Sequence, residues 1–108
     1  MLLLAKTYLL YTMLKTNLLN IEEIIELVKQ QEPDRKDVIE GLQKCSGGLW
    51  TSNGYFSFID STTANQIGAE WQFEESIVLE QENKGDIVLD LLKDGRIGGI
   101  EFIGLIDH

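Results

Sequence analysis

Few side chains in this sequence could take part in covalent catalysis, and their positions argue against it. The only histidine is His108, the final residue, where fraying is expected. A Ser-His-Asp or Cys-His arrangement therefore has no credible base. The only cysteine, Cys45, follows an apolar stripe, and we expect it to be a small buried hydrophobe rather than a reactive thiol. These positions favour a protein that is not an enzyme.

Motifs for cofactors and metals are also missing from the sequence. It contains neither GxxxxGK followed by Ser or Thr nor GxGxxG. We expect Gly95, Gly98 and Gly99 to form a turn and to let another part of the chain approach the backbone closely. One cysteine forbids an internal disulfide, and one histidine rules out a histidine-rich metal site. Paired carboxylates abound, but nothing in their pattern suggests a catalytic cleft. We expect no cofactor and no metal.

Carboxylates are the most abundant functional groups. The chain has 9 Lys and Arg against 18 Asp and Glu, a formal charge of -9. The second half is the acidic one, because residues 46–108 carry only Lys84, Lys93 and Arg96 against eleven acids. Such a surface attracts a basic partner and repels phosphate. We therefore expect no direct binding of nucleic acid.

The length of 108 residues fits a single domain over 1–108, with a helical part at 1–48 and a β-meander at 49–108. The leucine-rich N-terminus is interrupted by Lys6 and Lys15, too soon for a membrane span, and it lacks the order of a secretory signal. We expect a partly buried helix there, with export or an interfacial helix as the alternatives. A free cysteine without an export signal favours the cytoplasm and no membrane partner.

Apolar residues recur at helical spacing in the first half. The spacing predicts a helix over 20–31, begun by a capping box of Asn20 and Glu23 and ended by Pro33. Asp34 is expected to cap a next helix over 34–45, which Gly47 and Gly48 stop. A third helix is expected over 2–16, with a strand as its alternative.

From residue 49 the period changes to two. Asn53-Gly54 between LWTS and YFSFID predicts a hairpin whose turn residues tolerate positive φ. Turn signals then separate the runs AEWQFE, SIVLEQE, DIVLDLL and GGIEFIGLI. The sequence thus predicts an α+β fold, with about three N-terminal helices packed on an antiparallel β-meander of about five strands.

Alternation along these strands predicts an apolar face and an acidic face. We expect the core to contain Trp71, Phe73, Leu79, Leu89 and Phe102. The opposite face would gather the carboxylates of Glu70, Glu74, Glu80, Glu82 and Glu101 as a partner-binding surface. Tyr55 and Trp50 are the candidate anchors at its centre, although both could equally belong to the core. The simpler alternative is an acidic face that only keeps the protein in solution.

Four segments of the second half, 55–59, 77–82, 85–90 and 94–101, follow a recurring order. A tyrosine-containing strand precedes an acidic strand, a G-x-V-hydrophobic-D strand and D-G-x-hydrophobic-x-G-I-E. In this order the chain resembles a small uncharacterised family of bacterial β-meander proteins. It departs from the pattern by the longer insert STTANQIGAEWQF, by Gly98 and by its added helices. The resemblance implies a small protein without catalytic residues, and some family members look like antitoxin partners of ribonuclease toxins.

Residues 2–60 are also similar to a winged helix, with 34–45 as the recognition helix and Asn53-Gly54 at the wing tip. A DNA reader needs basic residues on both. The wing has none, and the helix mixes acids with bases: Asp34, Arg35, Lys36, Asp37, Glu40 and Lys44.

We expect the chain to be an immunity protein or antitoxin that binds and neutralises a basic toxin domain, a nuclease in our interpretation. Its size and acidity are similar to those of immunity proteins of contact-dependent growth inhibition and other interbacterial toxins. The alternatives are a winged-helix transcriptional regulator and a phage-type inhibitor or nucleic-acid mimic. The sequence leaves the toxin's identity and the oligomeric state open.

Overall fold

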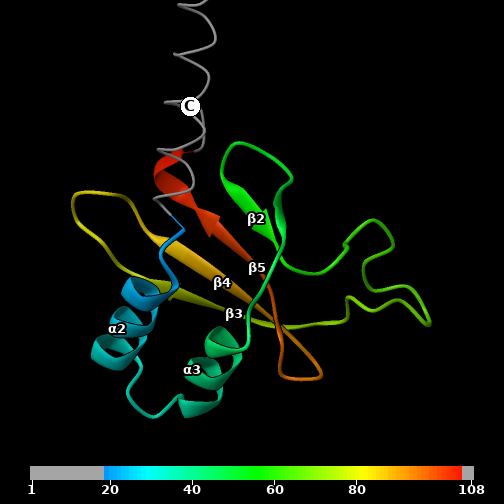
Figure 1. Ribbon diagram of the computed structural model, residues 1–108, viewed down its shortest axis with the longest axis horizontal. Coiled ribbons are helices and arrows are strands. Elements are labelled where there is room, and N and C mark those ends of the chain that lie inside the picture. The colour runs from blue at the N-terminus through cyan, green and yellow to red at the C-terminus, as the bar shows by residue number, and fades with distance from the viewer. Residues whose placement is uncertain (1–18, 106–108) are drawn as a thin grey trace, which may run out of the picture.

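Helices and strands are segregated along the chain, as the α+β prediction requires. The computed structural model describes residues 19–105 (Figure 1). This part contains the helices α2 (Ile21–Gln31) and α3 (Lys36–Gln43), followed by one antiparallel sheet of five strands. The helix expected over 2–16 and the residue His108 lie outside the described residues.

Helix α2 begins and ends where the sequence predicts. The side chain of Asn20 accepts a hydrogen bond of 3.2 Å from the backbone N–H of Glu23, which satisfies one of the free amides of the first turn. The last turn closes when the N–H of Glu32 donates to the carbonyl of Val28, directly before Pro33. The buried stripe consists of Ile24, Ile25 and Val28.

Helix α3 starts two residues later than expected, and the predicted cap is wrong. Its N-cap is Arg35, which makes no side-chain capping bond. Asp34 belongs instead to a turn closed by a 3.0 Å bond from the N–H of Arg35 to the carbonyl of Glu32. At the other end, α3 stops at Gln43 with Lys44 as its C-cap, earlier than expected, so Gly47 and Gly48 do not end the helix. Their φ values of 66° and 91°, which glycine adopts without steric cost, belong to the connection between α3 and β1.

The strands are β1 (Leu49–Trp50), β2 (Tyr55–Ser57), β3 (Phe73–Leu79), β4 (Ile87–Leu92) and β5 (Ile97–Phe102). All neighbours are antiparallel, but the order β1-β2-β5-β4-β3 is not that of a meander. The chain crosses from β2 to the far edge through residues 58–72, and only β3, β4 and β5 follow one another. The expected strands AEWQFE and SIVLEQE are not separate, because the single strand β3 takes in only the end of the first run and the start of the second.

The expected hairpin is present, but its turn differs from the prediction. β1 pairs with β2, with Trp50 opposite Phe56. The connection is four residues long, and among the described residues with positive φ neither Asn53 nor Gly54 appears. Gly54 is buried, and its carbonyl accepts a hydrogen bond from the N–H of Phe102 on β5. The connection between β1 and β2 is closed by a hydrogen bond of 3.0 Å from the N–H of Thr51 to the carbonyl of Tyr55.

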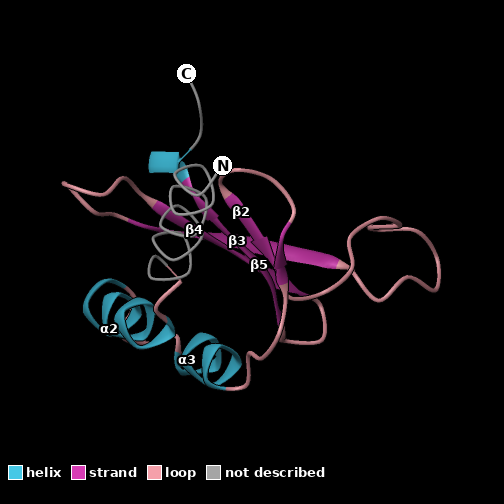
Figure 2. Ribbon diagram, turned by 45° about the horizontal axis from the view of Figure 1, so that its top comes forward, coloured by secondary structure: helices cyan, strands magenta, loops and turns pink. Residues whose placement is uncertain are grey.

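Both helices cover the same face of the sheet, as Figure 2 shows, with α2 against β3 and α3 against β5. The core between these layers is apolar, and Leu79, Leu89 and Phe102 belong to it as predicted. Trp71 is also buried, but it packs on the other face of the sheet, against Leu92 and the backbone of Gly98. We call the face without helices the open face.

The prediction that Phe73 is buried is wrong, because its side chain is 41% exposed. The pairing of β3 with β4 shifts by one residue between Phe73 and Glu75. Successive side chains of a strand point to opposite faces of the sheet. An extra residue therefore moves each side chain that precedes it to the other face. Phe73 is opposite Leu92 as a result, rather than in line with Ile77 and Leu79.

Candidate protein-interaction surface

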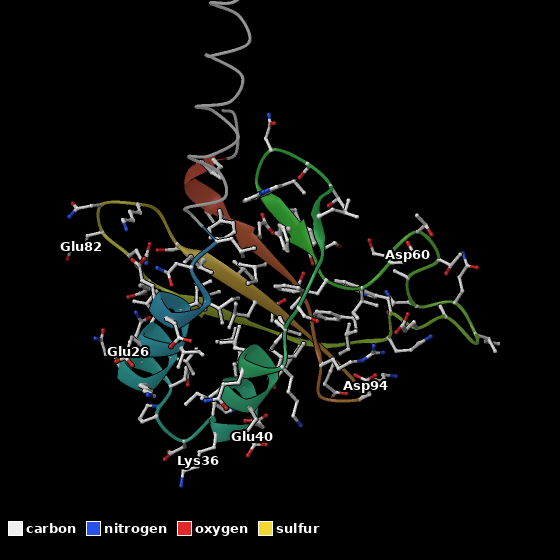
Figure 3. All side chains as sticks on the ribbon, in the orientation of Figure 1. Glu26, Lys36, Glu40, Asp60, Glu82 and Asp94 are labelled. Atoms are coloured by element: carbon white, nitrogen blue, oxygen red, sulfur yellow. The ribbon has the colours of Figure 1, made fainter. Side chains whose placement is uncertain are left out.

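The carboxylates predicted to share one face lie in four places. Glu70 is in the loop before β3, and its Oε1 accepts a hydrogen bond of 2.6 Å from Nη1 of Arg96. Glu74 is near the start of β3, whereas Glu80 and Glu82 follow its end. A strand advances about 3.3 Å per residue, so Glu74 and Glu80 are roughly 20 Å apart. Figure 3 accordingly shows Glu82 at the opposite end of the molecule from Asp94, the other partner of Arg96.

Glu80 and Glu82 do belong to a dense acidic group at their end of the sheet. A hollow of about 840 Å³ lies between the end of α2 and the β3–β4 connection. We call it the acidic notch, and its lining residues are Gln31, Glu32, Val78, Glu80, Gln81, Glu82 and Asp86. Four carboxylates and no basic side chain line it. Sequence alternation missed Glu32, because its proximity to Glu80 depends on how α2 docks on the sheet. It also missed Asp86, which comes next to Glu80 only through the pairing of Leu79 with Ile87.

The last predicted carboxylate, Glu101, is half-buried in β5 opposite both Val88 and Tyr55. Tyr55 is also half-buried, and its hydroxyl donates a hydrogen bond of 2.7 Å to Oδ2 of Asp90. Burial, followed by this hydrogen bond and the nearby carboxylate charges, raises the pKa of Tyr55 well above its usual range. The contacts of Tyr55 therefore stabilise the open face itself.

Trp50, the other candidate anchor, packs against the core. Its ring centroid is 5.4 Å from that of Phe56 and 5.5 Å from that of Phe102. Those aromatic contacts bury apolar surface within the fold. The structure thus brings Trp50 to neither the acidic notch nor Glu101.

Much of the positive charge is already neutralised within the chain. Arg35 pairs with Asp37 and Glu75, and Arg96 pairs with Glu70 and Asp94. Hydrogen bonds from the guanidinium groups hold the pKa values of Asp37 and Asp94 below their usual range. Lys84, on the β3–β4 connection, is 3.1 Å from Glu23. In the described part of the chain, the carboxylates of the acidic notch have no such ion pairs.

A second hollow, of about 470 Å³, lies between α3 and the β4–β5 turn. Its lining mixes acids and bases, including Asp37, Lys44 and Arg96, so it carries no strong charge of either sign. Cys45 is half-buried there, and its thiol donates to the carbonyl of Gly41. Burial raises the pKa of Cys45 to about 11. The thiol is thus protonated at neutral pH and a poor nucleophile.

Within residues 19–105, no group of three or more His, Cys, Asp or Glu side chains is placed to hold a metal ion. Across the same residues, no helix has both the length and the apolar character needed to cross a membrane. The chain matches no protein-family model, no curated protein and no solved structure.

Proposed function

We propose that this protein is an immunity protein or antitoxin that binds and neutralises a basic toxin domain, a nuclease, in the cytoplasm. The observation that carries the proposal is the acidic notch, in which four carboxylates meet without a compensating base. A concave acidic site attracts a positively charged surface, and it repels the nucleic acid that such a surface normally binds.

Neutralisation requires only that the acidic notch and its surroundings occupy the groove by which a nuclease holds its substrate. The carboxylates would accelerate encounter and select a basic partner, whereas apolar contacts would contribute most of the binding energy. Val78 provides such a contact, since it lines the notch and is 52% exposed. The chain's own bases do not compete, because Lys84 and Arg35 pair with carboxylates elsewhere.

The test uses the protein encoded by the reading frame next to this chain's gene. We expect it to be toxic alone and harmless when co-expressed with this chain. In stopped-flow mixing, Glu80→Lys with Glu82→Lys should slow association at least tenfold at low salt and flatten its salt dependence.

The matched control is Glu22→Lys with Glu40→Lys, which changes the net charge equally on the helices and outside the notch. The control should retain most of the association rate. Equal slowing by both pairs would show that only net charge matters. Unchanged kinetics in the notch variant, or no complex at all, would refute the proposed function.

A further inference from the structure

The outer edge of β3 is closed at one end by a side chain that imitates a neighbouring strand. β3 is the last strand of the sheet, with β4 on one side only. Nε2 of Gln31 donates to the carbonyl of Glu80 at 2.9 Å, and Oε1 of Gln31 accepts from the N–H of Glu80 at 2.7 Å. These are the two bonds that a paired residue of an antiparallel strand would make. The N–H and the carbonyl of Glu80 therefore point away from β4.

The same geometry exposes the backbone of two further residues. Because outward-pointing backbone groups recur at every second residue, those of Val78 and Ser76 point outward like those of Glu80. No residue of the described chain forms a hydrogen bond with these groups. At the far end, Oδ1 of Asn65 accepts from the N–H of Phe73 at 2.9 Å. Side chains thus cap both ends of β3 and leave an open window at Ser76 and Val78.

The surroundings of the window select the kind of strand that could fill it. The side chain of Val78, within the window, is exposed. Along the chain, Glu74 precedes the window and the residues of the acidic notch follow it. A second copy of this chain is a poor occupant, because pairing Ser76 of one copy with Val78 of the other would bring Glu74 opposite Glu80. Like charges directly opposite each other destabilise a sheet. Lysine or arginine at those positions of the incoming strand would be stabilising.

We propose that the window at Ser76 and Val78 binds an extended basic segment of the partner protein as an additional strand of the sheet. The segment's backbone would bond to both residues, and its basic side chains would enter the acidic notch. This proposal rests on the proposed function and specifies how the basic partner is held. The edge-strand proposal requires hydrogen bonds between the two backbones, whereas the proposed function requires only attraction between opposite charges.

The first measurement uses the unaltered protein and a defined probe, an acetylated and amidated seven-residue peptide of alternating Lys and Val. Amide hydrogen exchange followed by NMR should show fast exchange at Ser76 and Val78 in the free protein. Saturating peptide should slow both amides at least tenfold. Slow exchange without peptide would mean that another segment or copy already fills the window, and it would overturn the proposal.

The second measurement separates pairing from charge. Val78→Pro removes one outward N–H while leaving the bonds to β4, since proline is tolerated where a strand's N–H faces solvent. Val78→Thr is the matched control, because it alters the same side chain but keeps the N–H. Circular dichroism checks that both variants fold. Peptide affinity should fall about tenfold in Val78→Pro and little in Val78→Thr.

The result with the adjacent-gene toxin distinguishes the two proposals. Loss of toxin binding in Val78→Pro but not in Val78→Thr supports edge pairing. Equal toxin binding by both variants, or failure of the peptide to bind, overturns edge pairing and leaves the proposed function standing. Failure of the toxin to bind the unaltered protein overturns the proposed function, while the peptide still tests the window.

Discussion

The hydroxyl of Tyr55 donates a hydrogen bond to the carboxylate of Asp90, although their strands are not neighbours. β5 lies between β2 and β4, and the ring of Tyr55 crosses it over Gly99. A Cβ at Gly99 would clash with that ring. The other carboxylate oxygen of Asp90 accepts a bond of 2.7 Å from the hydroxyl of Ser76. One half-buried carboxylate thereby links β2, β3 and β4 on the open face, with the ring of Tyr55 packed across β5.

Tyr55→Phe should lower the free energy of unfolding by about 1.5–3 kcal/mol. The substitution keeps the ring over Gly99 but removes a hydrogen bond to a charged acceptor. Urea unfolding at neutral pH measures the change. Thr63→Ala, in the exposed loop before Trp71, is a suitable control and should change stability by less than about 0.5 kcal/mol. A Tyr55→Phe protein as stable as the unaltered one would show that the bond contributes nothing.

Stability should also fall at alkaline pH, and Tyr55 should account for part of the loss. Burial chiefly, with the bond to Asp90, raises the pKa of Tyr55 in the folded protein above its ordinary value of 10.0. Below pH 10 the phenol is neutral in both states, and its contribution is complete. As the pH rises further, the unfolded chain loses this proton first, so unfolding becomes easier.

Urea midpoints at pH 8 and pH 11 test this expectation. The unaltered protein should lose more stability over that interval than Tyr55→Phe, which lacks the group. Tyr8 and Tyr11 are present in both proteins and cancel in the comparison. Parallel loss in the two proteins would mean that the pKa of Tyr55 is not raised by folding.

Core and edge positions should respond very differently to truncation. Leu89 is fully buried between the helices and the sheet, and Leu89→Ala should cost about 2–5 kcal/mol of stability. Phe73→Ala removes a larger side chain, yet it should cost less than about 1 kcal/mol because that side chain is 41% exposed and lies outside the core. Chemical denaturation of the two variants gives the comparison. A larger loss at Phe73 would contradict the register shift in β3.

Local signals were sufficient where neighbouring residues decide the structure. Asn20 caps α2 through an amide three residues away, and Pro33 directly follows Glu32, the C-cap of that helix. Alternation correctly placed Leu89 and Leu79 in the core, because a regular strand with one covered face has a fixed side-chain period. The α+β class follows from these same local patterns.

Non-local contacts explain what the sequence could not predict. The strand order depends on where β3 pairs after a long connection, and no local residue specifies that choice. The bulge before Glu75 reverses Phe73, and the acidic notch needs Glu32 of the helical part beside Glu80 of the sheet. The bonds between Gln31 and Glu80 join residues 49 positions apart, so the open window on β3 was not visible either.

The winged-helix alternative leads to a prediction about DNA. Specific binding needs Lys and Arg clustered on the recognition helix and the wing, because release of counterions from phosphate drives association. The exposed side of α3 places Lys36 and Lys44 beside Asp37 and Glu40, and Arg35 is already paired with carboxylates. We expect no specific complex at physiological salt.

A mobility-shift assay with DNA from upstream of this chain's gene tests the prediction at about 0.15 M salt, with unrelated competitor DNA present. A shift that disappears when competitor is added would reflect only weak charge contacts. Lys36→Glu with Lys44→Glu would then abolish it, and toxin binding should remain. A shift that survives competitor and maps to a defined sequence would instead place the recognition surface on α3. That result would make the winged-helix regulator the better proposal, because an acidic antitoxin surface gives no reason for sequence-specific contacts to bases.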